Sequence, residues 1–378
     1  MKVLIAVTHL LGTGHLARAL TLARAFLAKG HQVQLLSGGF PAPQLDTKGV
    51  EITQLPPLRS DGVNFGQFLG RDGQPVEDIV HRERAEMLCA ALYEMQPDVL
   101  ITELYPFGRR ALRQEFLALL RAAQELPRRP VILSSIRDIL APPSKPEKAH
   151  KADAVIAEFY DAVLVHSDPE TTRLEASWPV SPQLQEKLRY TGYVAPPAAP
   201  PHPDLAGDNE ILVSAGGGSV GEQIYRCAIE AAKLMPDYRW RLLIGGQDAE
   251  ARISALKRAD SPALLEPARS DFRQMLHHAA ASVSMCGYNT ALDLLQAGTP
   301  GLFVPFDAGS EVEQGLRANS LAALPGFEII RSADLSAAKL VSTLRKLTQE
   351  PRRSTQNFHF DGASASVRIA EELAGAGT

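Results

Sequence analysis

The sequence predicts an α/β protein built from two Rossmann-like domains, each with a parallel sheet. A strand-helix-strand pattern opens the chain, and the same pattern restarts after a proline-rich segment near the middle. Parallel neighbouring strands need a crossover helix between them, so both patterns favour parallel sheets. The length agrees, because 378 residues with 45% hydrophobic content exceed what one ordinary core holds.

The first pattern consists of an opening strand, a glycine turn and a long helix. Residues 3–7 form an apolar strand, Gly12-Thr13-Gly14-His15 follow as the turn, and apolar residues then recur at the spacing of one helical face. Residues 33–36 form the next strand. Further apolar runs end in polar residues, which places polar side chains at the carboxyl edge of one sheet; these runs are 99–102, 131–134 and 162–165.

The proline-rich segment 193–208 marks the domain boundary, since its composition suits an extended connector better than a core. We expect an N-terminal domain over 1–194, a linker over 195–208 and a C-terminal domain over 209–352. The remaining residues, 353–378, contain one more predicted helix. The C-terminal domain repeats the order of strand, glycine turn and helix, with strands expected at 211–214, 240–244, 282–285 and 301–305.

Composition and charge exclude several classes of function. Lys and Arg number 39 against 43 Asp and Glu, and no basic or acidic run occurs, so nothing favours a nucleic acid partner. Three cysteines lie far apart in apolar stretches, which indicates reduced thiols rather than a disulfide framework or a zinc site. No apolar run is long enough to cross a bilayer, and the first is too short for a signal peptide. These features predict a cytoplasmic protein, with peripheral membrane contact left open.

Two glycine-rich turns could hold anions, one at 12–14 and one at 216–221. Glycine lets a ligand approach the backbone, and the N–H groups at a helix start attract phosphate. A nicotinamide dinucleotide site would also need an acidic residue at the end of the next strand, and both strands end instead in glycine and polar residues. No Gly-Lys-Ser/Thr follows either turn, which argues against a kinase-type phosphate loop. Plain tight corners without a ligand remain the alternative.

The stretch 286–305 is the most informative part of the sequence. It contains a glycine corner that opens a helix, an acidic residue in the second turn, a Gly-x-Pro end and an apolar strand that ends in proline. This stretch resembles the donor-binding domain of glycosyltransferase family 28, which includes the peptidoglycan N-acetylglucosaminyltransferase, and the similarity is greatest to a bacterial branch of predicted transferases. Residues 12–15, 216–219 and Glu313-Gln314 resemble further motifs of that family. The resemblance implies a GT-B fold, in which two Rossmann-like domains face each other and a C-terminal helix crosses back to the first.

The resemblance also implies a set of donor-binding residues. Asp293 would accept hydrogen bonds from ribose hydroxyls, because a carboxylate offers two acceptor oxygens. The family usually has Glu at this place, one methylene longer, and a solvated helix carboxylate is the alternative for Asp293. The other donor-binding candidates lie at glycine turns and helix starts; they are Gly14, Gly217, Gly218, Ser219, Asn289, Thr290, Glu313 and Gln314. Plain N-capping is the alternative for Asn289 and Thr290.

His15 is the candidate catalytic base. Transfer of a sugar requires removal of a proton from the acceptor hydroxyl, and an imidazole with a pKa near 6.5 can take it near neutral pH. The helix start favours the neutral form of His15. A capping or packing histidine is the alternative, and His9 is a rival for the role of base.

Polar residues after two strands are expected on the acceptor side. They follow the runs 99–102 and 131–134 and could bind an anionic or hydroxylated acceptor, although ordinary surface ion pairs are an equal alternative. These residues are Glu103, Arg109, Arg137 and Asp138.

The leading hypothesis is an inverting glycosyltransferase that uses a nucleoside diphosphate sugar, most simply a UDP-sugar, and a hydroxylated acceptor. No Asp-x-Asp signature occurs, so we expect no metal and no cofactor besides the co-substrate. Residues 12–18 also resemble the UDP-sugar hydrolase of pseudaminic acid biosynthesis, in which water replaces the acceptor. A nucleotide-sugar binding protein without turnover is the third alternative. The apolar helix expected at 112–123 is interpreted as core, with a membrane-facing patch as the alternative.

Overall fold

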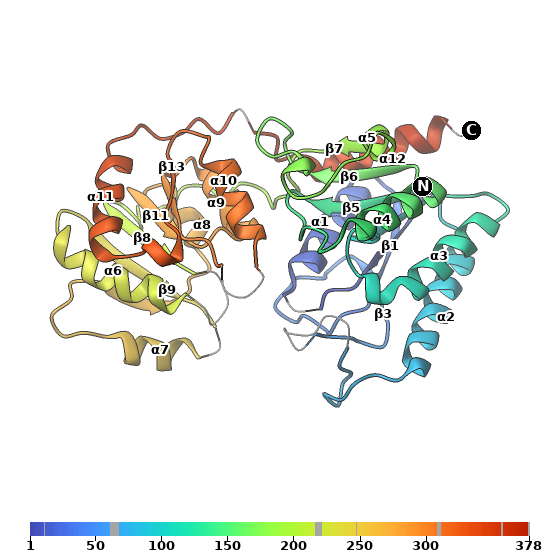
Figure 1. Ribbon diagram of the computed structural model, residues 1–378, viewed down its shortest axis with the longest axis horizontal. Coiled ribbons are helices and arrows are strands. Elements are labelled where there is room, and N and C mark those ends of the chain that lie inside the picture. Colours follow the sequence, from blue (N-terminus) through green and yellow to red (C-terminus); the bar gives the residue numbers. More distant parts are fainter. Residues whose placement is uncertain are drawn as a thin grey trace. The chain divides into compact units, whose positions relative to one another are not determined.

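A computed structural model gives the fold of the protein and describes residues 1–10, 12–60, 68–215, 221–246, 248–307, 311–356 and 358–376. The chain divides into two compact units, each with its own parallel sheet (Figure 1). Unit 1 comprises Met1–Pro196 and His359–Thr378, and unit 2 comprises Pro197–Phe358. The prediction of two Rossmann-like α/β domains is confirmed.

Unit 1 contains, within the described residues, a seven-stranded parallel sheet in the order β3-β2-β1-β4-β5-β6-β7. Its strands are β1 (Lys2–Val7), β2 (Gln32–Ser37), β3 (Glu51–Gln54), β4 (Val99–Glu103), β5 (Val131–Arg137), β6 (Ala162–His166) and β7 (Leu188–Tyr190). Its helices are α1 (Gly14–Ala28), α2 (Asp78–Met95), η1 (Arg110–Leu112), α3 (Arg113–Glu125), α4 (Pro146–Phe159), η2 (Leu174–Ala176), α5 (Pro182–Lys187) and α12 (Gly362–Ala376).

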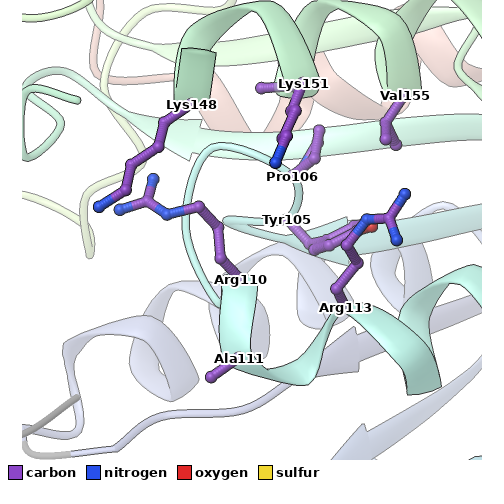
Figure 2. A pocket seen from close by; sticks show the side chains of 9 residues that line it. Tyr105, Pro106, Arg110, Ala111, Arg113, Lys148, Lys151 and Val155 are labelled. Atoms are coloured by element: carbon purple, nitrogen blue, oxygen red, sulfur yellow. The ribbon is translucent and has the colours of Figure 1, made fainter. Parts of the chain in front are cut away.

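Helices cover both faces of this sheet and form two separate cores. α1 and α12 pack on one face with strand residues such as Val3 and Ile5. α2, α3 and α4 pack on the other face with the alternate residue Leu4, and the segment after β4 encloses a cavity with α4 (Figure 2). Leu119 and Leu120 of α3 are fully buried in this second core. The apolar side of α3 therefore packs in the core, as the sequence analysis predicted.

The C-terminal segment belongs to unit 1, as the predicted returning helix requires. Figure 1 shows α12, in red, among the blue and green elements of that unit. The Tyr193 N–H donates to the His359 carbonyl at 2.7 Å, and the Gly362 N–H donates to the Tyr193 carbonyl at 3.1 Å. Gly192 has a φ of +78°, and a Cβ there would meet the His359 carbonyl oxygen at 2.6 Å. Glycine is therefore required where the returning segment crosses residue 192.

Unit 2 contains, in the part of the chain that is described, a six-stranded parallel sheet in the order β10-β9-β8-β11-β12-β13. Its strands are β8 (Glu210–Ser214), β9 (Arg239–Ile244), β10 (Leu264–Pro267), β11 (Ala281–Ser284), β12 (Gly301–Phe303) and β13 (Phe327–Ile329). Its helices are α6 (Glu222–Leu234), α7 (Ala249–Leu256), α8 (Phe272–Met275), α9 (Tyr288–Ala297), α10 (Glu313–Leu321), η3 (Ser332–Asp334) and α11 (Ala337–Leu347). The strand order is that of the Rossmann fold.

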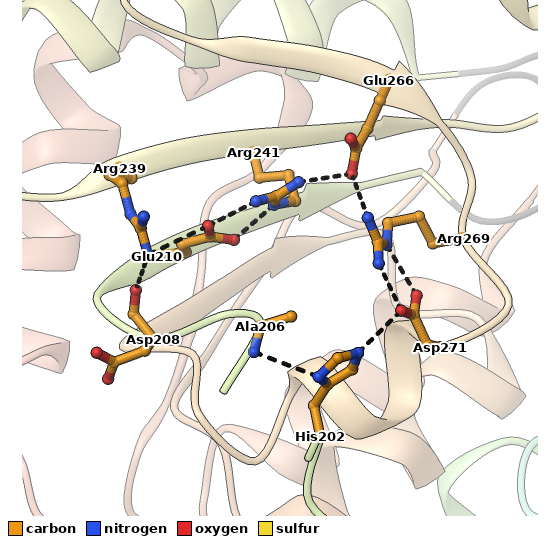
Figure 3. A network of polar contacts seen from close by, with 9 residues as sticks. All are labelled: His202, Ala206, Asp208, Glu210, Arg239, Arg241, Glu266, Arg269 and Asp271. Atoms are coloured by element: carbon orange, nitrogen blue, oxygen red, sulfur yellow. Dashed lines mark hydrogen bonds and ion pairs between the residues drawn. The ribbon is translucent and has the colours of Figure 1, made fainter. Parts of the chain in front are cut away.

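The proline-rich segment is attached to unit 2 rather than standing apart as the expected linker 195–208. His202 Nδ1 accepts the Asp204 N–H at 3.1 Å, so its Nε2–H donates to Asp271 at 3.2 Å. Asp271 is in turn paired with Arg269, and a line of alternating charges continues through Glu266 across the sheet (Figure 3). These contacts explain why residues 197–208 group with unit 2.

No helix within the described residues is both long enough and apolar enough to cross a membrane.

A fully buried ion pair joins α2 to α3 in unit 1. Arg84 donates from Nε and Nη2 to the two carboxylate oxygens of Glu115, both at 2.8 Å. The remaining donors of Arg84 reach the Gly38 carbonyl at 2.9 Å and the Thr8 hydroxyl at 3.1 Å, which ties both helices to the loops after β1 and β2. A buried pair is stabilising only while both charges are present, since one alone is left uncompensated.

Glu115→Ala should therefore lower the free energy of unfolding by about 3–5 kcal/mol, because it leaves Arg84 charged and buried. The matched control is Glu222→Ala, which breaks an exposed ion pair with Arg226. This substitution should change the free energy of unfolding by about 0.5 kcal/mol or less. Urea unfolding of both variants measures the difference. Equal effects of the two substitutions would contradict this account of the Arg84–Glu115 pair.

Candidate functional site

Both units place polar residues at the point where the strand order reverses. In open parallel sheets, ligands bind beyond the carboxyl ends of the strands at this point. It lies between β1 and β4 in unit 1, and between β8 and β11 in unit 2. In unit 1, His15 stands in the first turn of α1, directly after β1, and Glu103 is the last residue of β4. Each unit therefore has its own candidate site at its reversal point.

His15 and Glu103 form a buried hydrogen-bonded pair. His15 Nδ1 lies 2.9 Å from Glu103 Oε1, with 14% of the His15 side chain and 2% of the Glu103 side chain exposed. Arg18, one helical turn after His15, donates from Nη2 to the same carboxylate oxygen and is itself buried. A buried carboxylate needs such partners, because an unpaired charge in a low-dielectric interior is costly.

The partners of Glu103 determine the tautomer of His15. An ionised carboxylate only accepts hydrogen bonds, so the His15 Nδ1 that faces it must carry the proton. Arg18 Nη2 is 3.1 Å from the same Nδ1, but both atoms are then donors, so the hydrogen bond of Arg18 goes to the carboxylate. His15 Nε2 is left with the lone pair, and none of the described residues donates a hydrogen bond to it. This is the arrangement that a general base requires.

A line of hydroxyl and imidazole groups supports Glu103 from the sheet side. Ser135 of β5 donates to Glu103 Oε2 at 2.6 Å, and its oxygen lies 2.9 Å from His166 Nε2. Because the Ser135 proton goes to the carboxylate, His166 Nε2 must carry a proton and donate to Ser135. His166 Nδ1 then holds a lone pair and lies 2.9 Å from the Thr191 hydroxyl, which also donates to the Gly192 carbonyl at 2.7 Å. The hydrogen bonds from His166 to Ser135 and from Ser135 to Glu103 therefore both point toward the carboxylate.

Burial and charge keep both histidines neutral and Glu103 ionised. Burial lowers the pKa of His15 to about 3, and the Arg109 and Arg18 charges add to this against the hydrogen bond to Glu103. Burial likewise lowers the pKa of His166 to about 3. Burial alone would raise the pKa of Glu103, but the Arg18 charge and the hydrogen bonds from His15 and Arg18 outweigh it and hold that pKa below its usual range.

The first turn of α1 is open beside His15. Thr13 is the N-cap residue but its side chain makes no capping hydrogen bond, which leaves N–H groups of the first turn for a ligand. A Cβ on Gly12 or Gly14 would meet no described atom within 4 Å, so packing in the described residues does not require glycine at either place. Close approach of a ligand to the backbone is consistent with both glycines.

In unit 2, the start of α9 presents N–H groups and a carboxylate together. The N-cap Gly287 supplies no side chain, and the Ala291 N–H is bonded back to the Gly287 carbonyl. The N–H groups of 288–290 precede the first helical hydrogen bond and point out of the helix start, with Asn289 exposed beside them. Asp293 lies one turn further along the same helix. A helix start with a carboxylate behind it can receive a phosphate and a hydroxylated group side by side.

Asp293 is not a solvated carboxylate. Arg273 of α8 donates from Nε to Asp293 Oδ1 at 2.8 Å and from Nη2 to Gln296 Oε1 at 2.8 Å. Only 16% of the Asp293 side chain is exposed, and no described residue donates to Oδ2. Burial raises the pKa of Asp293 to about 6, although the Arg273 charge lowers it. The carboxylate therefore keeps acceptor positions on Oδ2, and its titration falls close to neutral pH.

Glu313 and Gln314 begin α10 and have backbone roles. Gln314 Oε1 accepts the Phe306 N–H at 3.1 Å, which closes the loop after β12 onto the helix. The Glu313 N–H donates to Glu311 Oε1 at 2.7 Å. Arg317 of the same helix donates to the Cys286 carbonyl at 3.0 Å, which holds α10 beside the turn that leads into α9. These contacts support the α9 site from the neighbouring helix.

The structure brings the predicted site residues together only in part. Gly217, Gly218 and Ser219 lie outside the described residues. Thr290 lies in the first turn of α9, beside Asn289.

Glu103 and Asp138 were predicted on the acceptor side, and the structure buries both. Glu103 is 2% exposed and serves His15, and Asp138 is 2% exposed and accepts the Ile139 N–H at 2.7 Å. Polar residues that follow a strand are therefore not necessarily exposed.

The other polar candidates of unit 1 have varied surroundings. Arg109 is half-buried and donates from Nε to the Thr8 carbonyl at 2.5 Å, which brings its charge near His15. Arg137 ends β5 and is half-buried. The rival base His9 is buried and is packed against Gly39, where a Cβ would meet its ring at 2.5 Å. This packing leaves His9 less room than His15 to meet a substrate.

Arg18, Ser135, His166 and Thr191 were missed by sequence reasoning. One signal was available, since Arg18 is three residues after His15 and residues at this spacing share a helix face. Ser135 lies within β5 and His166 ends the neighbouring strand β6, so the contact between their side chains follows only from the pairing of these two strands. Among the described residues, no group of His, Cys, Asp and Glu is arranged to hold a metal ion.

The lowered pKa of His166 predicts a pH-dependent stability. The unfolded chain binds a proton at this histidine below about pH 6.5, while the folded chain binds it only near pH 3, so the free energy of unfolding falls as the pH drops between these values. By pH 5 the loss due to His166 is about 2 kcal/mol.

Urea unfolding at pH 7 and pH 5 measures this loss. His15 has a similarly lowered pKa and adds a comparable loss, so His166→Gln should reduce the total loss by about 2 kcal/mol. His150→Gln, which replaces an exposed histidine of α4, should behave like the unmodified protein. The same pH dependence in all three proteins would count against a neutral, buried His166.

A family model matches most of the second half of the chain. Residues 212–373 match the model of the glycosyltransferase family 28 C-terminal domain. The UDP-N-acetylglucosamine–N-acetylmuramyl-(pentapeptide) pyrophosphoryl-undecaprenol N-acetylglucosamine transferase of Brucella canis is 33% identical over 187 residues, which is 47% of this chain and 49% of the relative. The protein of the same name in Brucella anthropi is 35% identical over 143 residues, 36% of this chain and 38% of the relative. The chain thus spans about half the length of the curated relatives it matches.

Solved structures match over almost the whole chain. MurG of Acinetobacter baumannii has a TM-score of 0.66 at 17% identity, covering 98% of this chain and 100% of that one. The calicheamicin glycosyltransferase CalG4 has a TM-score of 0.65 at 18% identity, covering 98% and 97%. Identities this low show the fold alone. The chain therefore has the GT-B fold of these structures, and its residues 212–373 match the model of the glycosyltransferase family 28 C-terminal domain.

Proposed function

We propose that the protein is an inverting glycosyltransferase that moves a sugar from a nucleoside diphosphate sugar, most simply a UDP-sugar, to a hydroxyl group. The observation that best supports the reaction is the His15–Glu103 pair at the reversal point of unit 1, in which His15 Nε2 is unprotonated. The donor class is supported by the family 28 match of residues 212–373 and by the names of the Brucella relatives, which act with UDP-N-acetylglucosamine.

His15 Nε2 would take the proton of the acceptor hydroxyl as its oxygen attacks the anomeric carbon. The attack comes from the side opposite the departing nucleoside diphosphate, so a single displacement inverts the configuration. The imidazolium that forms is stabilised by Glu103, as the carboxylate of a catalytic triad stabilises its histidine. Arg18 and Ser135 keep that carboxylate ionised and in place, because both donate to it.

The donor would bind at the start of α9. The N–H groups of 288–290 and the positive end of the helix favour the diphosphate, while Asp293 accepts from the ribose hydroxyls through Oδ2. Gly217, Gly218 and Ser219 are proposed as further diphosphate ligands on the family pattern. Under this proposal the charge on the leaving diphosphate is balanced by N–H groups, without a divalent metal or another cofactor.

The acceptor is proposed to be a hydroxylated molecule, and the Brucella relatives act on a pyrophosphoryl-undecaprenol acceptor by name. A lipid-linked acceptor would bring the protein to a membrane surface from the cytoplasmic side. Arg109 and Arg137 remain proposed for the acceptor side.

His15→Ala should lower kcat by about 10²–10⁴, because the acceptor proton loses its base. Isothermal titration should show the affinity for UDP unchanged, since the nucleotide contacts proposed at Asp293 and at the start of α9 are in unit 2. His9→Gln tests the rival base and should retain most of the turnover. Full activity of His15→Ala, or loss of activity only in His9→Gln, would remove His15 from the mechanism.

The affinity for UDP should weaken as the pH falls through about 6, because protonation of Asp293 removes a charged acceptor. Asp293→Asn should bind UDP about tenfold more weakly at pH 7.5 and should lose the part of this pH dependence that Asp293 causes. Glu230→Gln, at an exposed position of α6, serves as the control. Titration calorimetry at pH 7.5 and 5.5 measures both effects. An unchanged Kd for Asp293→Asn would exclude a direct contact with the nucleotide.

The resemblance of residues 12–18 to a UDP-sugar hydrolase makes a second assay necessary. Free sugar released from the donor without any acceptor, and stopped by His15→Ala, would indicate hydrolysis with water in the place of the acceptor. Nucleotide-sugar binding without turnover, across UDP, GDP and dTDP sugars with varied acceptors, would indicate a binding protein.

A further inference from the structure

We propose that the cavity between the segment after β4 and helix α4 in unit 1 is a second ligand site, and that it binds a phosphate-bearing molecule. The cavity has a volume of about 530 Å³ (Figure 2). Four of its lining residues carry a positive charge, Arg110 and Arg113 on one side and Lys148 and Lys151 on α4, and none is acidic. It includes neither His15 nor Asp293, so the inference does not depend on the proposed transferase reaction.

The four positive charges have no acidic partners within the described residues. Arg110 donates to the Phe107 carbonyl at 2.9 Å and Lys148 to the Ser144 hydroxyl at 2.6 Å, both neutral acceptors. Arg113 and Lys151 make no side-chain hydrogen bond to any described residue. The whole chain has a net charge of −4, so four uncompensated cations around one cavity do not follow from composition. They would repel one another unless an anion lies between them.

Tyr105 provides an independent indication of a ligand. The residue is 2% exposed, and its hydroxyl is buried with no hydrogen-bond partner among the described residues. Its ring is stacked on Phe116 at 4.5 Å between centroids, which fixes its direction, and Figure 2 shows the side chain extending toward Arg113. A buried hydroxyl without a partner is costly, and Tyr105 lines the cavity. A ligand oxygen there would accept its hydrogen bond.

The donor set fits phosphate in particular. Arg presents a planar fork that matches phosphate oxygens, and Lys adds a compact point charge. Burial raises the pKa of Tyr105 to about 12, so the phenol stays protonated and can only donate to an anion. Pro106, Ala152 and Val155 form an apolar wall next to these groups, which would contact the carbon part of an ester. A soluble phosphate ester and a lipid phosphate headgroup share this chemistry.

Inorganic pyrophosphate is the probe for the soluble source. Titration of the full-length protein in the presence of excess UDP, which occupies the proposed donor site, should show pyrophosphate binding. The variant R113Q/K151Q should bind it about tenfold more weakly, and Tyr105→Phe about three- to tenfold more weakly. The matched control is K257Q/R258Q, which removes the same charge from exposed residues of unit 2 and should bind as the unmodified protein does.

Sedimentation with vesicles of phosphatidylglycerol, compared with vesicles of phosphatidylcholine, tests the lipid source with the same variants. Binding to the former that R113Q/K151Q loses and K257Q/R258Q keeps identifies a lipid phosphate, whereas pyrophosphate binding alone identifies a soluble ligand. Thermal melting confirms that each variant is folded. The proposal is overturned if the unmodified protein binds neither probe, or if R113Q/K151Q binds as K257Q/R258Q does. Because UDP affinity is measured separately, failure here leaves the donor-site proposal intact.

Discussion

The buried carboxylate of Glu103 is the constraint on which the candidate active site of unit 1 depends. Ionised and almost without solvent, it would be strongly destabilising without partners. Arg18, His15 and Ser135 supply them from α1 and β5, so the same contacts that make the carboxylate tolerable also fix the start of α1 against the ends of β4 and β5. The orientation of His15 is therefore a consequence of how the sheet is stabilised.

In unit 2, the carboxylate of Asp293 is likewise held in place by an arginine. Asp293 stands one turn inside α9, where its short side chain keeps the carboxylate close to the helix. Arg273 contacts one oxygen and Gln296, which holds the group in place while the other oxygen stays unoccupied by described residues. Arg273 also competes with a nucleotide for Asp293, because it attracts the same carboxylate that a ribose would need. The balance between the two decides how tightly a nucleotide could bind.

The sequence predicted the central strands and the main helices, because buried parallel strands are continuous apolar runs and α1, α6 and α9 show a clear apolar face. Short edge strands such as β3 and β10 carry mixed residues and half-exposed positions, so no periodicity marks them. His15 and Asp293 could be found because each lies in a local motif. The surroundings of Glu103 could not, since they come from residues 15, 18, 103 and 135, which only the strand order and register bring together.

The tautomer and titration of His15 test the central claim most directly. Nitrogen NMR of the native protein with labelled histidine, assigned by comparison with His15→Gln, reports which ring nitrogen carries the proton. The account predicts a proton on Nδ1, a lone pair on Nε2, and no protonation of the ring as the pH falls from 8 to about 5. A proton on Nε2, or a titration near the ordinary value of about 6.5, would contradict it.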